Sequence, residues 1–282
     1  MKLHTINTGF FKLDGGAMFG VVPKSMWKKI NPPDDNNMCT WAMRCLLIET
    51  GDRKILVDTG IGNKQSEKFR SHFEPHGDDS LIGSLAAKGF KPEDITDVLL
   101  THLHFDHCGG AIRHNEAGEA VPTFPNATYW SNERHWNWAM NPNPREKASF
   151  LKENFQPLKD WGKLQFITAV DGEEWIEGIS IHYVFGHTEA MMVLKIIAGE
   201  KTLIYCADLL PSSGHIPLPY VMCYDIRPLV TLQEKEILLK RSAEKNYYLY
   251  FEHDPKMECA TVHKNERGRV VLKESFLMEE VF

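Results

Sequence analysis

The segment from Thr101 to Gly110 gathers several metal-ligand side chains in a few positions. It reads Thr-His-Leu-His-Phe-Asp-His-Cys-Gly-Gly and follows the apolar run 98–100, so the ligand-type residues stand at the end of a predicted strand: His102, His104, Asp106 and His107. Imidazole and carboxylate are the groups that zinc and its first-row neighbours bind. Alternate residues of an extended segment point to the same side, so His102 and His104 can bind one ion, and the turn that follows can bind a second. The segment therefore predicts a metal site, and we expect the fold to bring further ligands to it from other parts of the chain.

Further ligand-type residues stand at the ends of other strand-like runs. The alternating run 179–185 breaks just before His187, the apolar run 203–207 ends at Asp208, and the run 247–251 is followed by Glu252 and His253. Upstream, the run 54–57 ends in Asp58 and a glycine turn. Strand ends that carry ligands in this order indicate one site assembled from several strands.

With these residues the chain resembles the metallo-β-lactamase-fold hydrolases over nearly its whole length. The resemblance rests on Asp58-Thr59-Gly60, the 102–107 cluster, Gly186-His187-Thr188, Asp208 and His253. It implies an α/β fold, a four-layer αβ/βα sandwich of two mixed β-sheets packed face to face, with helices on the outer faces and ligands at one edge. It also implies two divalent ions. The first would be held by His102, His104 and His187, the second by Asp106, His107 and His253, and Asp208 would bridge both.

Two positions narrow the branch of the family that the chain resembles. His104 is a glutamate in the flavodiiron branch, and Asp208 is a cysteine in many β-lactamases that bind a second zinc, so both of those activities are disfavoured. A bridging aspartate is typical of lactonases, glyoxalase II, organophosphate hydrolases and RNase Z. The net charge of −6 and the lack of a Lys/Arg-rich stripe give no electrostatic footprint for a nucleic acid. The chain is identified as closest to the N-acyl homoserine lactonase and methyl parathion hydrolase-like branch.

The resemblance also implies a mechanism and its catalytic residues. Two ions sharing an oxygen lower the pKa of water towards about 7 and polarise the substrate, so that a bridging hydroxide can attack. Asp208 would hold the ions together, and Asp106 would carry a proton to the leaving group. Zinc is expected, with Mn, Fe or Co as alternatives, because an N/O ligand set accepts each of them. Asp58 is either a residue that orients an imidazole or a plain turn aspartate.

Two departures from the family pattern lie near the expected substrate. The motif Gly-His-Thr-Pro-Gly is replaced by Gly186-His187-Thr188-Glu189-Ala190, and the lactonase tyrosine that follows the bridging aspartate is replaced by Pro211. A replacement hydrogen-bond donor is sought in the segment 211–224, at His215, Tyr220 or Tyr224. The apolar segment 15–27 either packs in the core or lines a substrate pocket. The candidate substrate-binding residues are therefore Met18, Phe19, Trp27, His215 and Tyr220.

The favoured function is hydrolysis of a small ester or lactone, as in N-acyl homoserine lactonases that quench quorum sensing, with phosphotriesters as a second substrate class. A glyoxalase-II-like thioester hydrolase is the alternative, although it would need a basic patch for the glutathione carboxylates and none is evident. A binding or sensing module that keeps its metals is the alternative from outside the enzymes.

The rest of the sequence predicts a single domain over 1–282 with a small-molecule substrate. No Gly/Ser/Pro-rich linker divides the chain, no apolar run is long enough for a membrane span, and the N-terminus lacks signal-peptide character, so a cytoplasmic location is expected. The six scattered cysteines are expected to be free thiols, and a homodimer is left open. Strands are expected over 3–8, 44–49 and 54–57. Helices are expected over 81–88, 131–140 and 231–244, and the aromatic side chains of the second are expected in the core rather than in a lid.

Overall fold

A computed structural model describes all residues from 1 to 282, and the backbone divides into two compact units. Unit 1 comprises Met1–Gly9 and Met43–Thr168, and unit 2 comprises Phe10–Ala42 and Ala169–Phe282. The strands β1 (Lys2–Asp14) and β2 (Met38–Thr50) contribute residues to both units. Both strands are longer than the sequence predicts. The expectation of a single domain over the whole chain stays a prediction.

Unit 1 contains a six-stranded mixed sheet in the order β1-β2-β3-β4-β7-β8. β2 pairs antiparallel with β3 (Arg53–Val57), and β3 is followed by three parallel neighbours, β4 (Asp97–Leu99), β7 (Thr128–Ser131) and β8 (Leu164–Phe166). Parallel strands need crossover connections, and these contain α3 (Glu67–Phe73), α4 (Leu81–Ala87), α5 (Phe105–Cys108), α6 (Glu133–Met140) and α7 (Gln156–Asp160). A small hairpin joins β5 (Ile112–His114) and β6 (Ala120–Pro122).

The core of unit 1 lies between this sheet and its helices. Alternate residues of the strands pack with the apolar face of α4 and with Leu158 of α7, and all of them are buried: Leu47, Leu56, Val98, Tyr129, Leu164, Leu81 and Leu85. The predicted helix over 81–88 is confirmed. The helix predicted over 131–140 begins two residues later, because Ser131 ends β7 and the side chain of Asn132 accepts a hydrogen bond from the backbone N–H of His135.

Unit 2 contains a seven-stranded mixed sheet in the order β15-β14-β13-β12-β11-β10-β9. Its strands are β9 (Glu174–Ile176), β10 (Ile179–Val184), β11 (Met191–Ala198), β12 (Lys201–Tyr205), β13 (Tyr248–Tyr250), β14 (Cys259–Lys264) and β15 (Val270–Phe276). Only β12 and β13 pair in parallel, while the other neighbours are antiparallel. The carboxyl ends of β10, β12 and β13 consequently share one edge of the sheet.

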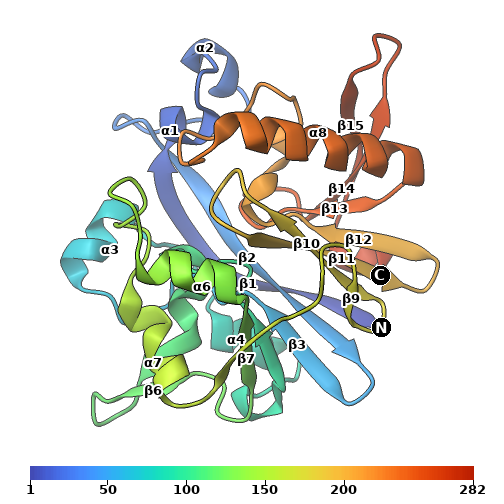
Figure 1. Cartoon of the computed structure of the whole chain (residues 1–282). Helices are drawn as coiled ribbons and strands as arrows, with labels where there is room; N and C mark the ends of the chain where they lie inside the picture. Colours follow the sequence, from blue (N-terminus) through green and yellow to red (C-terminus); the bar gives the residue numbers. More distant parts are fainter. The chain divides into compact units, whose positions relative to one another are not determined.

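The longest helix of unit 2 is α8 (Pro228–Lys245), which packs on β14 and β15 (Figure 1). It is longer than predicted because Pro228 stands at its first turn, where a missing N–H costs nothing, and it ends at Asn246 in the left-handed conformation. The short helices of unit 2 are α1 (Gly15–Phe19), α2 (Lys24–Trp27) and α9 (Met278–Val281). The segment 15–27 thus forms two short helices, as its glycines and proline indicate.

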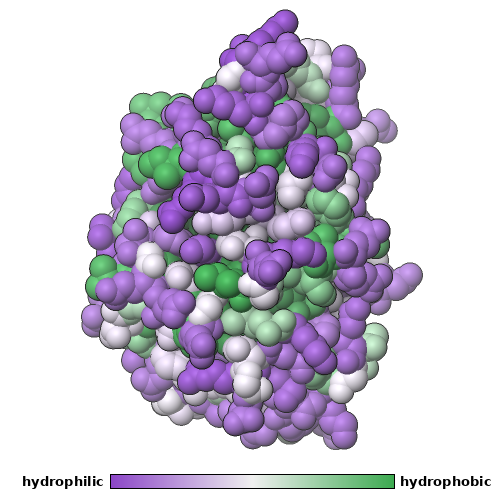
Figure 2. Space-filling view, turned by 90° about the vertical axis from the view of Figure 1, so that its right-hand side faces the viewer, coloured by the Kyte–Doolittle hydropathy of each residue, from purple (hydrophilic) through white to green (hydrophobic).

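Both mixed sheets with their helices confirm the predicted α/β class. No helix is both long enough and apolar enough to cross a bilayer. On the face seen in Figure 2, hydrophobic residues form small areas among predominantly hydrophilic ones. All six cysteines are free thiols, as expected.

Candidate metal centre

The parallel register of unit 1 brings two strand ends to the same edge. Val57 of β3 is the partner of Leu99 of β4, so Asp58 and Thr101 follow side by side. The turn Asp58-Thr59-Gly60 is tied to the cluster helix α5, since the backbone N–H of Thr59 donates to the His107 carbonyl at 2.7 Å. A Cβ at Gly110 would lie 2.2 Å from the carbonyl oxygen of Thr59. Glycine after the cluster therefore allows the close approach that places α5 against this turn.

Asp58 holds the imidazoles of the cluster through a buried hydrogen-bond network. Its Oδ1 accepts from the backbone N–H of Thr101 at 2.8 Å, and its Oδ2 accepts from the Thr101 hydroxyl at 2.7 Å and from Nδ1 of His107 at 3.2 Å. Since that hydroxyl donates to Asp58, its oxygen is free to accept from Nδ1 of His102, 3.1 Å away. Both rings are thereby oriented with Nε2 as the atom that can bind a metal. The contact with His107 agrees with the orienting role, one of the two alternatives that the sequence left open for Asp58.

His104 lies near a different carboxylate. Its Nε2 lies 3.8 Å from Oε1 of Glu146, a carboxylate that is itself fixed by Nε1 of Trp138 at 2.8 Å and by Nδ2 of Asn143 at 2.6 Å. At 3.8 Å the contact between His104 and Glu146 is longer than a hydrogen bond. Glu146 is a residue that the sequence does not signal, because it lies in an irregular stretch far from any strand end.

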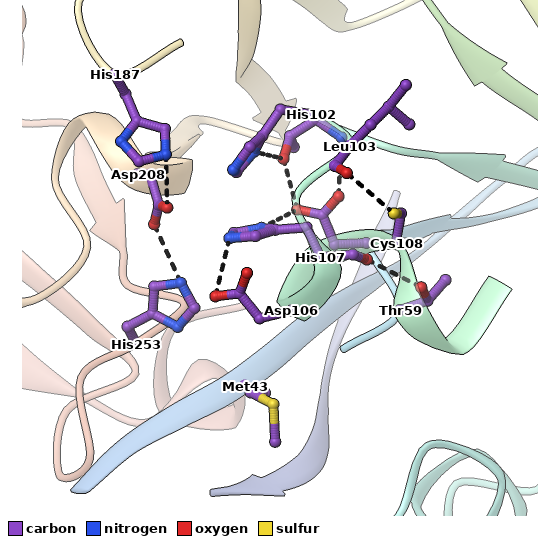
Figure 3. A network of polar contacts seen from close by, with 12 residues as sticks. Met43, Thr59, His102, Leu103, Asp106, His107, Cys108, His187, Asp208 and His253 are labelled. Carbon is purple, nitrogen blue, oxygen red and sulfur yellow. Dashed lines mark hydrogen bonds and ion pairs between the residues drawn. The ribbon is translucent and has the colours of Figure 1, made fainter. Parts of the chain in front are cut away.

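Two other side chains support the same loop. His135 of α6 is fully buried, and its Nε2 accepts from the backbone N–H of Leu103 at 2.8 Å, between the two cluster histidines. Cys108 Sγ donates to the Leu103 carbonyl at 3.4 Å (Figure 3), and burial raises the pKa of its thiol to about 12. Cys108 is buried and does not join the side chains whose ligand atoms gather within reach of one ion, so it belongs to the packing. His135 is likewise a core residue rather than part of a lid.

Unit 2 brings the other three predicted ligands together at the shared edge of its strands. Asp208 lies between two histidines (Figure 3): its Oδ2 is 3.1 Å from Nε2 of His187 and its Oδ1 is 3.0 Å from Nε2 of His253. The other nitrogens of the rings face acceptors, since Nδ1 of His187 donates to Oδ1 of Asp225 at 2.8 Å and Nδ1 of His253 donates to the Ala42 carbonyl at 2.7 Å. Each ring is again oriented with Nε2 towards the ligand position.

The His187 loop departs from the family motif and is held by contacts of its own residues. Glu189, where the family has proline, forms an ion pair with Arg227 at 2.8 Å, and Arg227 also donates to the Phe185 carbonyl at 2.7 Å. Ala190 adopts the left-handed conformation, with φ of 51°, at the position of the family's second glycine. Helix α8 completes the support, because the Glu234 carboxylate accepts from the backbone N–H groups of Phe185 and Gly186 at 2.7 and 3.1 Å.

The donor set of unit 2 fits a divalent cation. Burial lowers the pKa of His187, but the carboxylates of Asp208 and Asp225 outweigh this and raise it to about 10. The His187 ring lies between two carboxylates and is protonated, with Nε2 facing Asp208 and Nδ1 facing Asp225. A divalent cation bound at Nε2 would supply positive charge in place of that proton. Imidazole nitrogens with a shared carboxylate are the donors that zinc, manganese, iron and cobalt bind.

The predicted catalytic residue Asp106 lies on α5 with Oδ2 at 3.7 Å from Nε2 of His107 (Figure 3), and it is nearly buried. The predicted ligands of the two units are thus arranged as two sets. Unit 1 gathers His102, His104, Asp106 and His107, and unit 2 gathers His187, Asp208 and His253. Asp225 was missed by the sequence interpretation, since no pattern marks it as a partner of His187.

The candidate substrate residues form one cluster within unit 2. Phe19 stacks on the ring of His215, with centroids 4.9 Å apart and planes at 8°, and on Trp27 at 5.5 Å and 16°. Tyr220 meets Phe19 edge-on at 6.1 Å. We call these four residues, Phe19, Trp27, His215 and Tyr220, the Phe19 stack. Met18 contributes its carbonyl, which accepts from Nε2 of His215 at 2.9 Å.

His215 uses both ring nitrogens inside the protein. With Nε2 donating to Met18, its Nδ1 accepts from the Ser212 hydroxyl at 2.7 Å. Burial lowers the pKa of His215 to about 4, so the ring is neutral. His215, Met18, Phe19 and Trp27 are all buried. Their contact with a substrate stays a prediction, as does that of Tyr220, and neither ring nitrogen of His215 is free to donate to a substrate.

Comparison with known proteins identifies a family. The model of the metallo-beta-lactamase superfamily matches residues 44–253. An N-acyl homoserine lactonase of Bacillus cereus is 33% identical over 214 residues, which cover 72% of this chain and 73% of the relative.

Solved structures agree on the fold. A probable metal-dependent hydrolase from Staphylococcus aureus superposes with a TM-score of 0.85 at 29% identity, covering 98% of both chains. AidC, a dizinc quorum-quenching lactonase in complex with a homoserine product, superposes with a TM-score of 0.78 at 22% identity, covering 98% of this chain and 95% of that one.

Proposed function

Since the chain belongs to the metallo-beta-lactamase superfamily of metal-dependent hydrolases, we propose that its two ligand sets form one binuclear centre that hydrolyses a small lactone or ester. In this proposal His102, His104 and His187 would hold one divalent ion, Asp106, His107 and His253 would hold the other, and Asp208 would be shared by both. The ions, when bound, lower the pKa of water and polarise the substrate carbonyl.

The observation that carries the proposal is the orientation of the histidines. His102, His107, His187 and His253 each turn Nδ1 towards a hydrogen-bond acceptor of the protein. Hydrogen bonds of this kind fix the tautomer of metal-binding imidazoles and raise their basicity. Histidines that only fill a core have no reason to share this arrangement. Asp208 supports the bridge, because each of its oxygens faces a different histidine.

The chain's own residues have separate roles in the proposed reaction. Asp208 holds His187 and His253 in place, one at each of its two oxygens. Asp106, next to His107, is the proton carrier that protonates the leaving alkoxide oxygen when the ring opens. Asp58 and Asp225 hold the imidazoles and do not touch the substrate.

An N-acyl homoserine lactone is the proposed substrate class, and quorum quenching is the proposed role. The name of the Bacillus cereus relative and the homoserine product bound to AidC support this choice. In this chain Phe19, Trp27 and His215 are buried and Tyr220 is the partly exposed member of the Phe19 stack, so the stack would hold Tyr220 as an aromatic wall for an acyl tail; apolar side chains with a few polar groups are typical of small-molecule sites. Phosphotriesters are a second substrate class, because the same centre would polarise a phosphoryl oxygen.

The experiment is a substrate panel on zinc-reconstituted protein. Proton release would be followed for a series of N-acyl homoserine lactones with tails of increasing length, next to an aryl phosphotriester and a glutathione thioester. We expect lactone turnover that is lost in Asp208→Asn and kept in Asp171→Asn, a matched change at an exposed aspartate of unit 2. Turnover of the thioester alone would favour the glyoxalase-II alternative, and no turnover of any substrate at full metal content would favour a binding module.

Three further expectations stay predictions. Zinc as the native metal is to be tested by elemental analysis, the cytoplasmic location by fractionation, and the homodimer by light scattering.

A further inference from the structure

Lys235 is a buried cation in the middle of α8. Its side chain is 1% exposed, and its ammonium Nζ lies within hydrogen-bond distance of three backbone carbonyls: His215 at 3.0 Å, Pro217 at 3.2 Å and Tyr220 at 2.8 Å. The three acceptors lie in one short irregular segment, and each of the three ammonium hydrogens has one of them as its partner. The lysine thus ties the helix to the backbone of 215–220.

Packing alone does not explain a lysine at this position. Burial lowers its pKa to about 7, because the charged form loses its hydration and gains no carboxylate hydrogen bond in return. Buried charges are often replaced by apolar residues of similar volume without loss of stability. A methionine or leucine could fill the space, but neither could donate to three carbonyls that pair with no neighbouring strand. What the lysine adds is a defined backbone conformation for 215–220.

That backbone carries half of the Phe19 stack. Lys235 bonds the carbonyls of His215 and Tyr220, and the side chains of these two residues meet the ring of Phe19 on its face and at its edge. The other half comes from α1 and α2, and α1 is joined to the same segment, because Nε2 of His215 donates to the Met18 carbonyl at 2.9 Å. A shift of the backbone of 215–220 would therefore move the rings of His215 and Tyr220 away from the ring of Phe19.

We propose that Lys235 is a positioning residue that sets selectivity for the apolar tail of the substrate by holding the Phe19 stack in place. The inference rests on the proposed lactonase or esterase function, since it concerns the tail-binding surface of that site. Lys235 does not touch the reacting atoms, so it acts on the binding of long tails and leaves the metal centre alone.

The test is Lys235→Met, with Lys240→Met as the matched control on the exposed side of the same helix. kcat and KM would be measured for short and long tails in two series, N-acyl homoserine lactones and 4-nitrophenyl esters, at equal metal content. We expect the preference for long over short tails, as a ratio of kcat/KM, to fall by about tenfold in Lys235→Met, because each buried CH₂ contributes about a fourfold factor and tenfold corresponds to somewhat less than two CH₂ groups that lose their burial. The loss should lie in KM, and the control should stay within about twofold of wild type.

Backbone hydrogen exchange gives a second readout that needs no turnover. Lys235→Met should speed exchange across 215–221 and leave the segments around His187 and His253 unchanged, whereas Lys240→Met should change neither. An unaltered exchange pattern, or an unaltered tail preference in an active variant, would overturn the inference. If Lys235→Met does not fold, Phe19→Leu takes its place, and a full tail preference in that variant overturns the selectivity role. Wild-type protein that hydrolyses neither series refutes the proposed function, and exchange alone then decides the positioning role.

Discussion

The Asp225–His187 hydrogen bond makes a quantitative prediction about metal affinity. The bond is 2.8 Å long, the Asp225 side chain is 1% exposed, and it joins a carboxylate to the ring that is expected to bind a metal through its other nitrogen. A buried hydrogen bond to a charged group contributes about 1.5–3 kcal/mol. Asp225→Ala should therefore weaken binding of the ion held by His187 by about 10- to 100-fold, the range seen when such partners of metal-binding histidines are removed.

The size of this loss should depend on pH. In the metal-free protein Asp225 also helps to raise the pKa of His187 to about 10, so its removal lowers that pKa and makes the competing proton easier to displace. At neutral pH the easier loss of this proton offsets part of the loss of metal affinity in Asp225→Ala. This offset disappears as the pH approaches 10, because the wild-type His187 ring then loses its proton without a metal. The metal affinity of Asp225→Ala should consequently fall further below that of the wild type between about pH 7 and pH 9.

The assay is competition for zinc against a chromophoric chelator at several pH values, with circular dichroism to confirm the fold. Asp225→Asn should lose less affinity, because an amide oxygen can still accept from Nδ1 without the charge. Asp171→Ala is the control, since Asp171 is an exposed aspartate 4.0 Å from His182 in the same unit. Folded Asp225→Ala protein with wild-type affinity at pH 9, or an equal loss in Asp171→Ala, would refute the reasoning.

Three other outcomes are expected. Elemental analysis after reconstitution should find close to two ions per wild-type chain, and Asp208→Ala should retain fewer and lose turnover by more than about a hundredfold; full metal content with normal activity would exclude the bridging role. Apparent zinc affinity of the wild type should rise by at least about tenfold per pH unit below pH 9, because the proton of His187, with a pKa of about 10, must leave first; a flat profile in chelator competition would contradict this. Gly186→Ala should destabilise the protein by about 1–3 kcal/mol in denaturant unfolding, because its Cβ would lie 2.2 Å from Oγ1 of Thr231; unchanged stability would show that the His187 loop can shift.

The sequence alone predicted the parts of this protein that depend on local pattern. An apolar run followed by His102 and His104 indicates a strand end without knowledge of the rest of the fold. Glycine after the cluster allows the close approach of the Asp58 turn that the structure contains. The order of ligand-bearing strand ends was enough to indicate the family and its fold. An orienting role was one of two alternatives for Asp58, and only the structure identified His107 as its partner.

Roles that depend on segments far apart in the chain were not predictable in this way. Asp225 and Glu146 stand in irregular stretches with no periodicity, and only packing brings one to His187 and the other to His104. His215 could be recognised as a candidate, but sequence does not tell whether a loop histidine is solvated or buried with both nitrogens engaged.

Lys235 shows most clearly the difference between what local sequence indicates and what tertiary structure decides. A lysine within a helix reads as a solvated side chain, because charged residues are almost always exposed unless they are paired. Its burial here depends on three carbonyls contributed by a segment some fifteen to twenty residues earlier in the chain. Local sequence determined which residues could bind a metal, since that property belongs to each side chain and its strand. Tertiary structure decided which residues hold them in place, because a hydrogen bond forms only where the fold brings donor and acceptor within about 3 Å.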